Sequence, residues 1–319
     1  MRRITRISIA TLFLLAVGGP CLADEAGEGA TTSALETLDY LALFGYMAII
    51  VIVGIYFARG EKTTDDYFLA GRRVPWWAAT LSIFSTYLSA ITFMAIPATA
   101  FNGNWITVWM NIGIMLVAPV TVFCLLPFFR RLNVTSIYEY LELRFGPGLR
   151  VYGSLAFMAY QVAKMGIFLL LPALALATVT GFNLYLCIAI MGLLCIVYTV
   201  LGGIEAVVWT DVLQSVVLIG GALMCIGMIF SAENFEFERM WSVAVTEETN
   251  KFSVGNPATD VFWYFLIGGF FVQLVPFTSD QAVAQRFLTT PDEKSAARSV
   301  WAHAAMVIPA SLLFFGLGT

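Results

Sequence analysis

Long apolar runs dominate this sequence of 319 residues. Hydrophobic residues make up 60% of the chain and charged residues 12%, and a helix that crosses a bilayer needs about 20 mostly apolar residues. Seven runs of this kind are present, and an eighth begins near Ala296 and continues to Thr319. The seven runs cover residues 40–58, 77–101, 107–129, 151–179, 184–201, 208–231 and 260–284. The sequence therefore predicts an all-α polytopic membrane protein.

The first residues have the pattern of a cleavable signal peptide. Arginines at positions 2, 3 and 6 precede a short apolar stretch over residues 7–17, and small residues follow it. We predict a signal peptide over residues 1–23, cut after Ala23, because the apolar stretch is short for the alternative, an uncleaved first span. In either case residues 24–39 form an extracytoplasmic segment, and the mature N-terminus lies outside.

Basic residues concentrate in alternate loops between the runs. Cytoplasmic loops of membrane proteins carry the excess of Lys and Arg. Eleven basic residues fall in the loops predicted to be cytoplasmic: Arg59, Lys62, Arg72, Arg73, Arg130, Arg131, Arg144, Arg150, Arg286, Lys294 and Arg298. The opposite loops hold only Arg239 and Lys251, both within the predicted extracytoplasmic loop 232–259. This asymmetry predicts the orientation, in what we expect to be a bacterial inner membrane.

Several function classes lack the residues that they need. The five cysteines, at positions 21, 124, 187, 195 and 225, form no CxxC or metal-ligand spacing. His303 is the single histidine, and a packing role is expected for it, since Ser-His-Asp and zinc chemistry need further partners. The GxxxxGK[ST] motif of nucleotide-driven motors does not occur in the sequence. We therefore expect neither an enzyme nor a nucleic-acid-binding protein, and no cofactor.

Hydroxyl residues crowd the second apolar run. They are Thr80, Ser82, Ser85, Thr86, Ser89 and Thr92, and Pro97 follows them. Proline removes a backbone donor and clashes with the preceding turn, so Pro97 predicts a broken helix. Where such a break lines a cavity, its free carbonyls and hydroxyls can bind Na⁺. The alternative, close helix packing through small residues, stays open.

Three ionisable residues lie within or at the end of apolar runs. Lys164 has no acid near it in the sequence, and an ionisable group at membrane depth indicates a functional site. Asp211 can either couple an ion or cap a helix that starts after the glycine pair at 202–203. For Asp280 we expect an ion pair with Arg286 that holds the helix end. We favour this role over ion binding.

Four segments resemble the sodium:solute symporter family in sequence, order and spacing. They are DDYFLAGRRVPWW (65–77), LSAITFMAIPA (88–98), YTVLGGIEAVVWTDVLQ (198–214) and SDQAVAQRFL (279–288). Within the family, three segments are most similar to the sodium/sialic acid symporter branch: LSAITFMAIPA, LPFFRRLNVTSIYEYLELRFG and LPALALATVTG. The resemblance extends from about Tyr40 to the end of the chain.

The resemblance implies a LeuT-type fold of two inverted five-helix repeats that works by alternating access. Residues 40–58 would form an extra N-terminal helix, residues 76–231 the complete first repeat, and residues 260–319 the start of an incomplete second repeat. The family's sodium site also uses hydroxyls of the eighth core helix, whereas this chain stops inside the seventh. We therefore expect a fragment, a truncated gene, or a second chain that supplies the rest.

The resemblance also assigns site residues. For the sodium site it implies the backbone carbonyls of Ser85 and Leu88, together with Asp211. For the solute it implies the hydroxyls of Ser89 and Thr92, and Gln273 on a second broken helix.

Lys164 departs from the sialic acid branch. It stands where the branch has an arginine that holds the substrate carboxylate as a two-donor fork, and lysine keeps the charge without the fork. An anionic solute remains the expectation, either sialic acid or another sugar acid or organic acid. The alternatives are that Lys164 snorkels to the interface or pairs with an acid on another helix.

These observations predict a secondary active transporter that couples Na⁺ movement to uptake of a small polar, anionic solute across a lipid bilayer. The alternative is a non-transporting solute sensor, or one subunit of a split transporter. Binding of the solute without Na⁺-driven flux would favour that alternative.

Overall fold

The computed structural model describes residues 37–58, 63–132, 136–231, 236–246, 250–256, 258 and 260–319. Helices make up almost all of these residues, and no strand occurs among them. The predicted signal peptide, residues 1–23, and the segment 24–36 after it lie outside the described residues.

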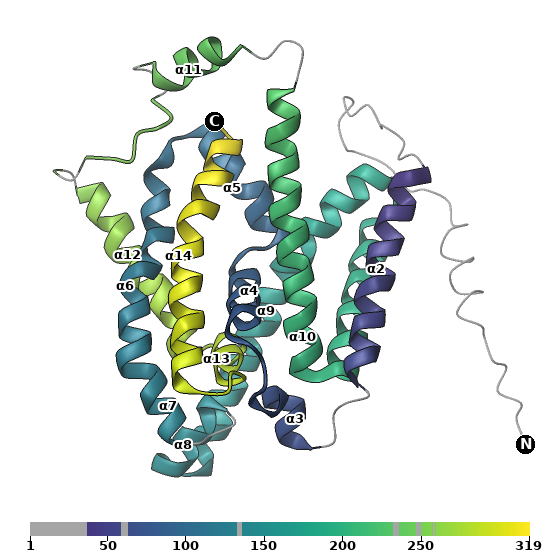
Figure 1. Cartoon of the computed structure of the whole chain (residues 1–319), viewed down its shortest axis with the longest axis vertical. Coiled ribbons are helices and arrows are strands. Elements are labelled where there is room, and N and C mark those ends of the chain that lie inside the picture. Colours follow the sequence, from purple (N-terminus) through teal and green to yellow (C-terminus); the bar gives the residue numbers. More distant parts are fainter. Residues whose placement is uncertain are drawn as a thin grey trace, which may run out of the picture.

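Six helices in the described ranges are long and apolar enough to cross a membrane, and a bent pair, α4 with α5, makes seven. Most of them run roughly along the vertical of Figure 1. The six spans lie in α2 (Thr37–Ala58), the continuous stretch of α6 (Val108–Val120), η3 (Thr121–Leu125) and α7 (Leu126–Leu132), α9 (Pro147–Thr180), α10 (Leu184–Phe230), α12 (Asp260–Ser279) and α14 (Glu293–Leu317). The apolar runs of the sequence therefore correspond to membrane-spanning helices.

Shorter helices connect the spans or form parts of broken ones. They are α3 (Thr64–Leu69), η1 (Ala70–Arg72), α4 (Trp76–Tyr87), α5 (Ala90–Asn102), η2 (Trp105–Thr107), α8 (Ile137–Phe145), α11 (Phe237–Val245) and α13 (Gln281–Leu288).

The second apolar run is broken between α4 and α5, which are bent by 56°. Leu88 has an extended backbone, with φ −94° and ψ 111°. Ser89 then starts α5 as the first residue of a capping box with Thr92. The helix is therefore broken as predicted, but the break is not at Pro97, which lies inside α5. The reciprocal capping at Ser89 starts a new helix eight residues earlier than the proline.

The fifth and sixth apolar runs form one element, α10, which turns sharply at Gly203. Gly203 has φ 53° and ψ −157°, a backbone conformation that favours glycine. Figure 1 shows the turn at the bottom of the view, between a part of α10 beside α2 and the long upright part. Asp211 lies eight residues beyond the turn, inside the helix, so the alternative that Asp211 caps a helix is wrong.

The core lies where α4, α6 and α7 pack against α13 and α14. Large buried side chains such as Ile83, Ile114 and Phe287 fill it. The backbones of α6 and α12 come very close: a Cβ added to Gly113 would lie 2.6 Å from the carbonyl carbon of Gly269. Small residues allow such close helix contacts in membranes. This packing holds the first half of the chain against α12 and α14, and the site lies between these two parts.

Candidate solute and sodium site

A cavity of about 120 Å³ lies beside the break between α4 and α5, bordered also by α6, α12 and α14. Three residues assigned to the site from the sequence line it: Leu88, Thr92 and Gln273. Thr92 comes from the start of α5 and Gln273 from the middle of α12, so the fold brings distant segments together. Leu88 is the residue at which α4 ends.

Sequence reasoning missed two polar residues that line the same cavity, Asn111 on α6 and Ser311 on α14. Asn111 is the only amide residue in the apolar run 107–129, and a polar side chain at membrane depth is a signal that could have found it. Ser311 is almost fully buried. Together with Thr92 and Gln273, these side chains offer neutral hydrogen-bonding groups to a ligand.

His303 on α14 also lines this cavity and is 1% exposed. Its ring packs against three aromatic rings, with centroids 5.1 Å from Tyr87, 6.1 Å from Phe277 and 6.2 Å from Phe84. His303 therefore packs against aromatic rings, as expected, but it also borders the cavity. Its Nδ1 atom is buried and makes no hydrogen bond within the described part of the chain.

Ser89 and Thr92 hold the break through their side chains. The Ser89 hydroxyl accepts a hydrogen bond from the Thr92 backbone N–H at 3.4 Å, and the Ser89 N–H donates to the Thr92 hydroxyl at 3.3 Å. The Thr92 hydroxyl donates in turn to the carbonyl of Tyr87 at 3.2 Å. The Ser89 N–H thus bonds to Thr92 instead of to the Ser85 carbonyl, as a continuous helix would require. Ser85 and Ser89 lie at this break but are not among the residues that line the cavity.

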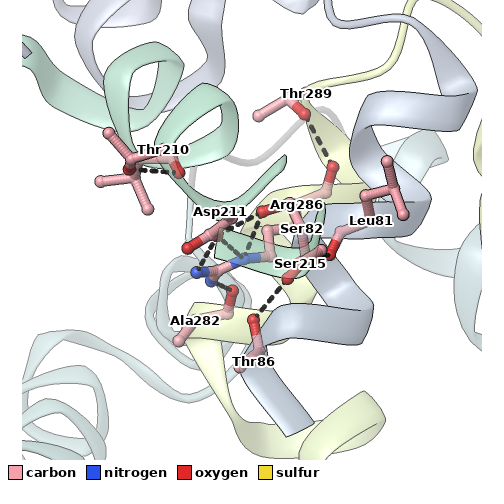
Figure 2. Close-up of polar contacts among 10 residues, drawn as sticks. Leu81, Ser82, Thr86, Thr210, Asp211, Ser215, Ala282, Arg286 and Thr289 are labelled. Carbon is pink, nitrogen blue, oxygen red and sulfur yellow. Dashed lines mark hydrogen bonds and ion pairs between the residues drawn. The ribbon is translucent and has the colours of Figure 1, made fainter. Parts of the chain in front are cut away.

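Asp211 and Arg286 form a buried ion pair, shown in Figure 2. The Arg286 Nη2 atom donates to Asp211 Oδ2 at 2.9 Å, and Nε lies 3.2 Å from the same oxygen. Ser82 completes the cluster: its hydroxyl donates to Asp211 Oδ2 at 2.6 Å and accepts from Arg286 Nε at 2.8 Å. Arg286 also donates to the carbonyl of Ala282. The cluster joins α4, α10 and α13.

The expected pair between Asp280 and Arg286 is wrong. Asp280 caps α13 instead, because its Oδ1 atom accepts from the backbone N–H of Ala282 at 2.8 Å. Six residues separate Asp280 from Arg286, which is about one and two-thirds turns of helix, so the two side chains leave the helix in different directions. Arg286 therefore reaches Asp211 on α10.

Lys164 on α9 lies beside Asp280, with 3.7 Å between Nζ and Oδ2. This distance is within ion-pair range but too long for a good hydrogen bond. The Nζ atom also lies over the rings of Phe168, at 5.4 Å from the centroid, and Tyr160, at 5.8 Å. Asp280 and Tyr160 line a second cavity of about 300 Å³. The structure thus brings Lys164 to an acid on another helix, and Lys164 is not among the residues that line the cavity with Gln273.

Comparison with known proteins identifies the family. The model of the sodium:solute symporter family matches residues 67–319. The chain belongs to the sodium:solute symporter family. It is 38% identical over 292 residues to the sodium/sialic acid symporter of Aliivibrio fischeri, in a match that covers 89% of this chain and 57% of the relative. It is also 38% identical over 290 residues to the sodium/sialic acid symporter of Proteus mirabilis, covering 88% of this chain and 58% of that protein.

A solved structure shares the fold. The substrate-bound outward-open state of a Na⁺-coupled sialic acid symporter superimposes with a TM-score of 0.80 and 37% sequence identity, covering 89% of this chain and 60% of that one. The chain therefore spans about three-fifths of the length of these relatives. The predicted all-α membrane fold of LeuT type and the predicted family are confirmed. This member of the family is a multi-pass membrane protein and not an enzyme.

Proposed function

We propose that the protein is a secondary active transporter that couples Na⁺ entry to uptake of a small, polar, anionic solute such as sialic acid. One observation carries the proposal: the break between α4 and α5 opens onto a cavity lined by Leu88, Thr92 and Gln273. Discontinuous helices that meet near the middle of the membrane are how secondary transporters build solute and ion sites. The sialic acid symporters to which the chain is similar support the solute class.

In this proposal, the break supplies the sodium site. The backbone carbonyls of Ser85 and Leu88 would coordinate Na⁺, because a helix that ends at Tyr87 leaves carbonyls near its end without helical donors. Asp211 would act through its cluster with Ser82 and Arg286. In this buried cluster the charges of Asp211 and Arg286 balance each other. Alternating access would then involve movement of α13, which carries Arg286, relative to α4 and α10.

The solute carboxylate would interact with Lys164. In the structure Asp280 already neutralises this lysine at 3.7 Å, with a contact that is longer than a strong charge-assisted hydrogen bond. A solute carboxylate could therefore compete with Asp280 for Lys164. Thr92, Ser89 and Gln273 would contact the polar remainder of the solute.

Location follows from the relatives, and orientation from the distribution of charge. We propose the inner membrane of a bacterium, because the two sialic acid symporters that the chain resembles are bacterial. We place the mature N-terminus outside, because the basic residues of the chain concentrate in loops on one side.

The test is Na⁺-dependent binding of N-acetylneuraminic acid, measured by calorimetry on the protein in lipid nanodiscs. We would use the 319-residue chain and, in parallel, a chimera in which the remaining C-terminal length of the Proteus mirabilis symporter follows Thr319. We expect binding in Na⁺ and none when K⁺ replaces it. Thr92→Val should weaken binding, whereas the matched control Thr99→Val on the exposed face of α5 should not. Equal binding in Na⁺ and K⁺ would contradict Na⁺ coupling.

A further inference from the structure

One residue that lines the cavity beside the broken helix, His303, has a buried polar atom without a partner. Nδ1 of His303 makes no hydrogen bond within the described part of the chain, although the residue is 1% exposed. Buried polar groups in native proteins are nearly always hydrogen-bonded, so a group that is not requires an explanation, such as a bound water, ion or ligand. The hydroxyl of Tyr87 is a second such atom, and both residues line the cavity.

The two unpaired groups lie together. The rings of His303 and Tyr87 are 5.1 Å apart, and they come from α14 and from the last turn of α4. Packing alone does not account for the imidazole. A phenylalanine would make the same contacts with Tyr87, Phe277 and Phe84 and would bury no polar atom.

No residue that lines this cavity carries a charge unless the His303 imidazole is protonated. The polar side chains of the cavity are the hydroxyl residues Tyr87, Thr92 and Ser311, the amide residues Asn111 and Gln273, and the imidazole of His303. Such groups pair with hydroxyl and amide groups of a ligand, whereas a carboxylate requires a cation such as Lys164. A cavity of this kind is suited to the hydroxylated part of a solute.

We propose that His303 hydrogen-bonds a hydroxyl or amide group of the transported solute and is a specificity-determining residue of the site. This inference rests on the proposed function and narrows it. The solute is a polyhydroxylated acid, and a simple monocarboxylate without hydroxyl or amide groups leaves Nδ1 unpaired. A site built to pair with a polar group discriminates strongly against ligands that lack that group.

The single histidine makes the proposal directly measurable. Protein labelled with ¹⁵N-histidine and purified without a histidine tag gives imidazole signals from His303 alone. The experiment uses the 319-residue chain, and the chimera with every histidine of its added segment replaced, in lipid nanodiscs with saturating Na⁺, titrated with N-acetylneuraminic acid or with propionate. We expect N-acetylneuraminic acid to shift the imidazole ¹⁵N signals, and propionate to leave them in place.

Substitutions measure the contribution of the ring nitrogen. We expect His303→Phe to weaken N-acetylneuraminic acid binding by at least about tenfold while the melting temperature stays the same or rises, since the change removes an unpaired buried polar atom. His303→Asn places an amide near the position of Nδ1 and should keep affinity within about threefold of the wild type. Phe277→Leu is the matched control, because Phe277 contacts the imidazole ring but does not line the cavity.

Two results would overturn the inference, and they differ from each other. If the wild type binds N-acetylneuraminic acid without any change in the imidazole signals, then His303 has a packing role only, and His303→Phe should bind equally well. If folded wild-type protein does not bind N-acetylneuraminic acid at all, the proposed solute is wrong and this inference fails with it. The ¹⁵N measurement needs no substitution, so it decides the question even if His303→Phe does not fold.

Discussion

Arg286 Nη2 lies 2.9 Å from Asp211 Oδ2, and both residues are 8% exposed. The two are 75 residues apart in the sequence, on α13 and α10, and Ser82 on α4 bonds to both (Figure 2). Removing one member of a buried ion pair leaves the other charge buried and uncompensated, which costs far more than the pair itself contributes. This cluster therefore fixes α4, α10 and α13 relative to one another.

Arg286→Gln should destabilise the protein by about 3 to 5 kcal/mol, because Asp211 would remain buried without its partner. Asp211→Asn should also destabilise it. The double variant should lose much less than the sum of the two single losses, as expected for residues in direct contact. Tryptophan fluorescence during thermal unfolding in detergent would compare the stability of the wild type, the two single variants and the double variant. Additive losses would mean that the two residues act independently.

Lys164→Ala should weaken binding of an anionic solute far more than binding of Na⁺, because it removes the cation that faces a carboxylate. Lys164→Arg should preserve or improve binding of N-acetylneuraminic acid, since arginine supplies two donors. Calorimetry with each ligand separates the two effects. An equal loss for solute and Na⁺ would indicate misfolding, and no effect of either substitution would remove Lys164 from the site.

Asp280→Asn should strengthen binding of the anionic solute. The substitution removes the charge that competes for Lys164 at 3.7 Å, and asparagine still caps α13. Thr278→Val is a suitable control, because the Thr278 hydroxyl donates within its own helix, to the carbonyls of Leu274 and Val275, and Thr278 does not line the cavity beside Asp280. Calorimetry with N-acetylneuraminic acid gives the comparison. Weaker binding in Asp280→Asn would show that the acid supports the site and does not compete with the solute.

Acid should weaken the start of α14 through Asp292, which caps it outside the membrane span. Hydrogen bonds from Ser295, from its side chain first and then its backbone N–H, hold the pKa of Asp292 below its usual value. A lowered pKa means that the ionised form stabilises the fold above about pH 4, the ordinary Asp value, and that this stabilisation is lost as the pH falls through the folded-state pKa.

Asp292→Asn keeps a capping oxygen but does not titrate in this range. We expect the melting temperature of the wild type to fall more steeply than that of Asp292→Asn below about pH 4. Parallel pH dependence in the two proteins would show that this carboxylate contributes nothing to the acid sensitivity.

The spans could be predicted from the sequence because the bilayer imposes a length and an apolar composition on each of them. The position of the break in the second run could not be predicted from Pro97 alone. Capping of α5 by Ser89 decided it, and Pro97 is accommodated within the helix. The resemblance to the family implied a broken helix whose carbonyls at Ser85 and Leu88 bind Na⁺, and the break at Leu88 and Ser89 lies beside these residues.

Side-chain partners were harder to predict. The sequence suggested Asp280 as the partner of Arg286 because the two are close in the chain. Helix geometry separates their side chains, and the fold places Asp211 of α10 beside Arg286 instead. Lys164 shows the same limit, since its partner lies on another helix. Asn111 was within reach of sequence reasoning, as a lone amide in an apolar run. The unpaired nitrogen of His303 was not, because only the packed structure shows which polar atoms lack partners.

The central claim is that Na⁺ drives solute uptake, and the most direct measurement is accumulation of radiolabelled N-acetylneuraminic acid in proteoliposomes. The 319-residue chain and the chimera extended after Thr319 would be compared under an inward Na⁺ gradient. We predict that at least one of them concentrates the solute inside the vesicles, and that replacing Na⁺ with K⁺ abolishes the accumulation. Folded protein that binds the solute with Na⁺ but never concentrates it in either form would contradict transport and favour a sensor.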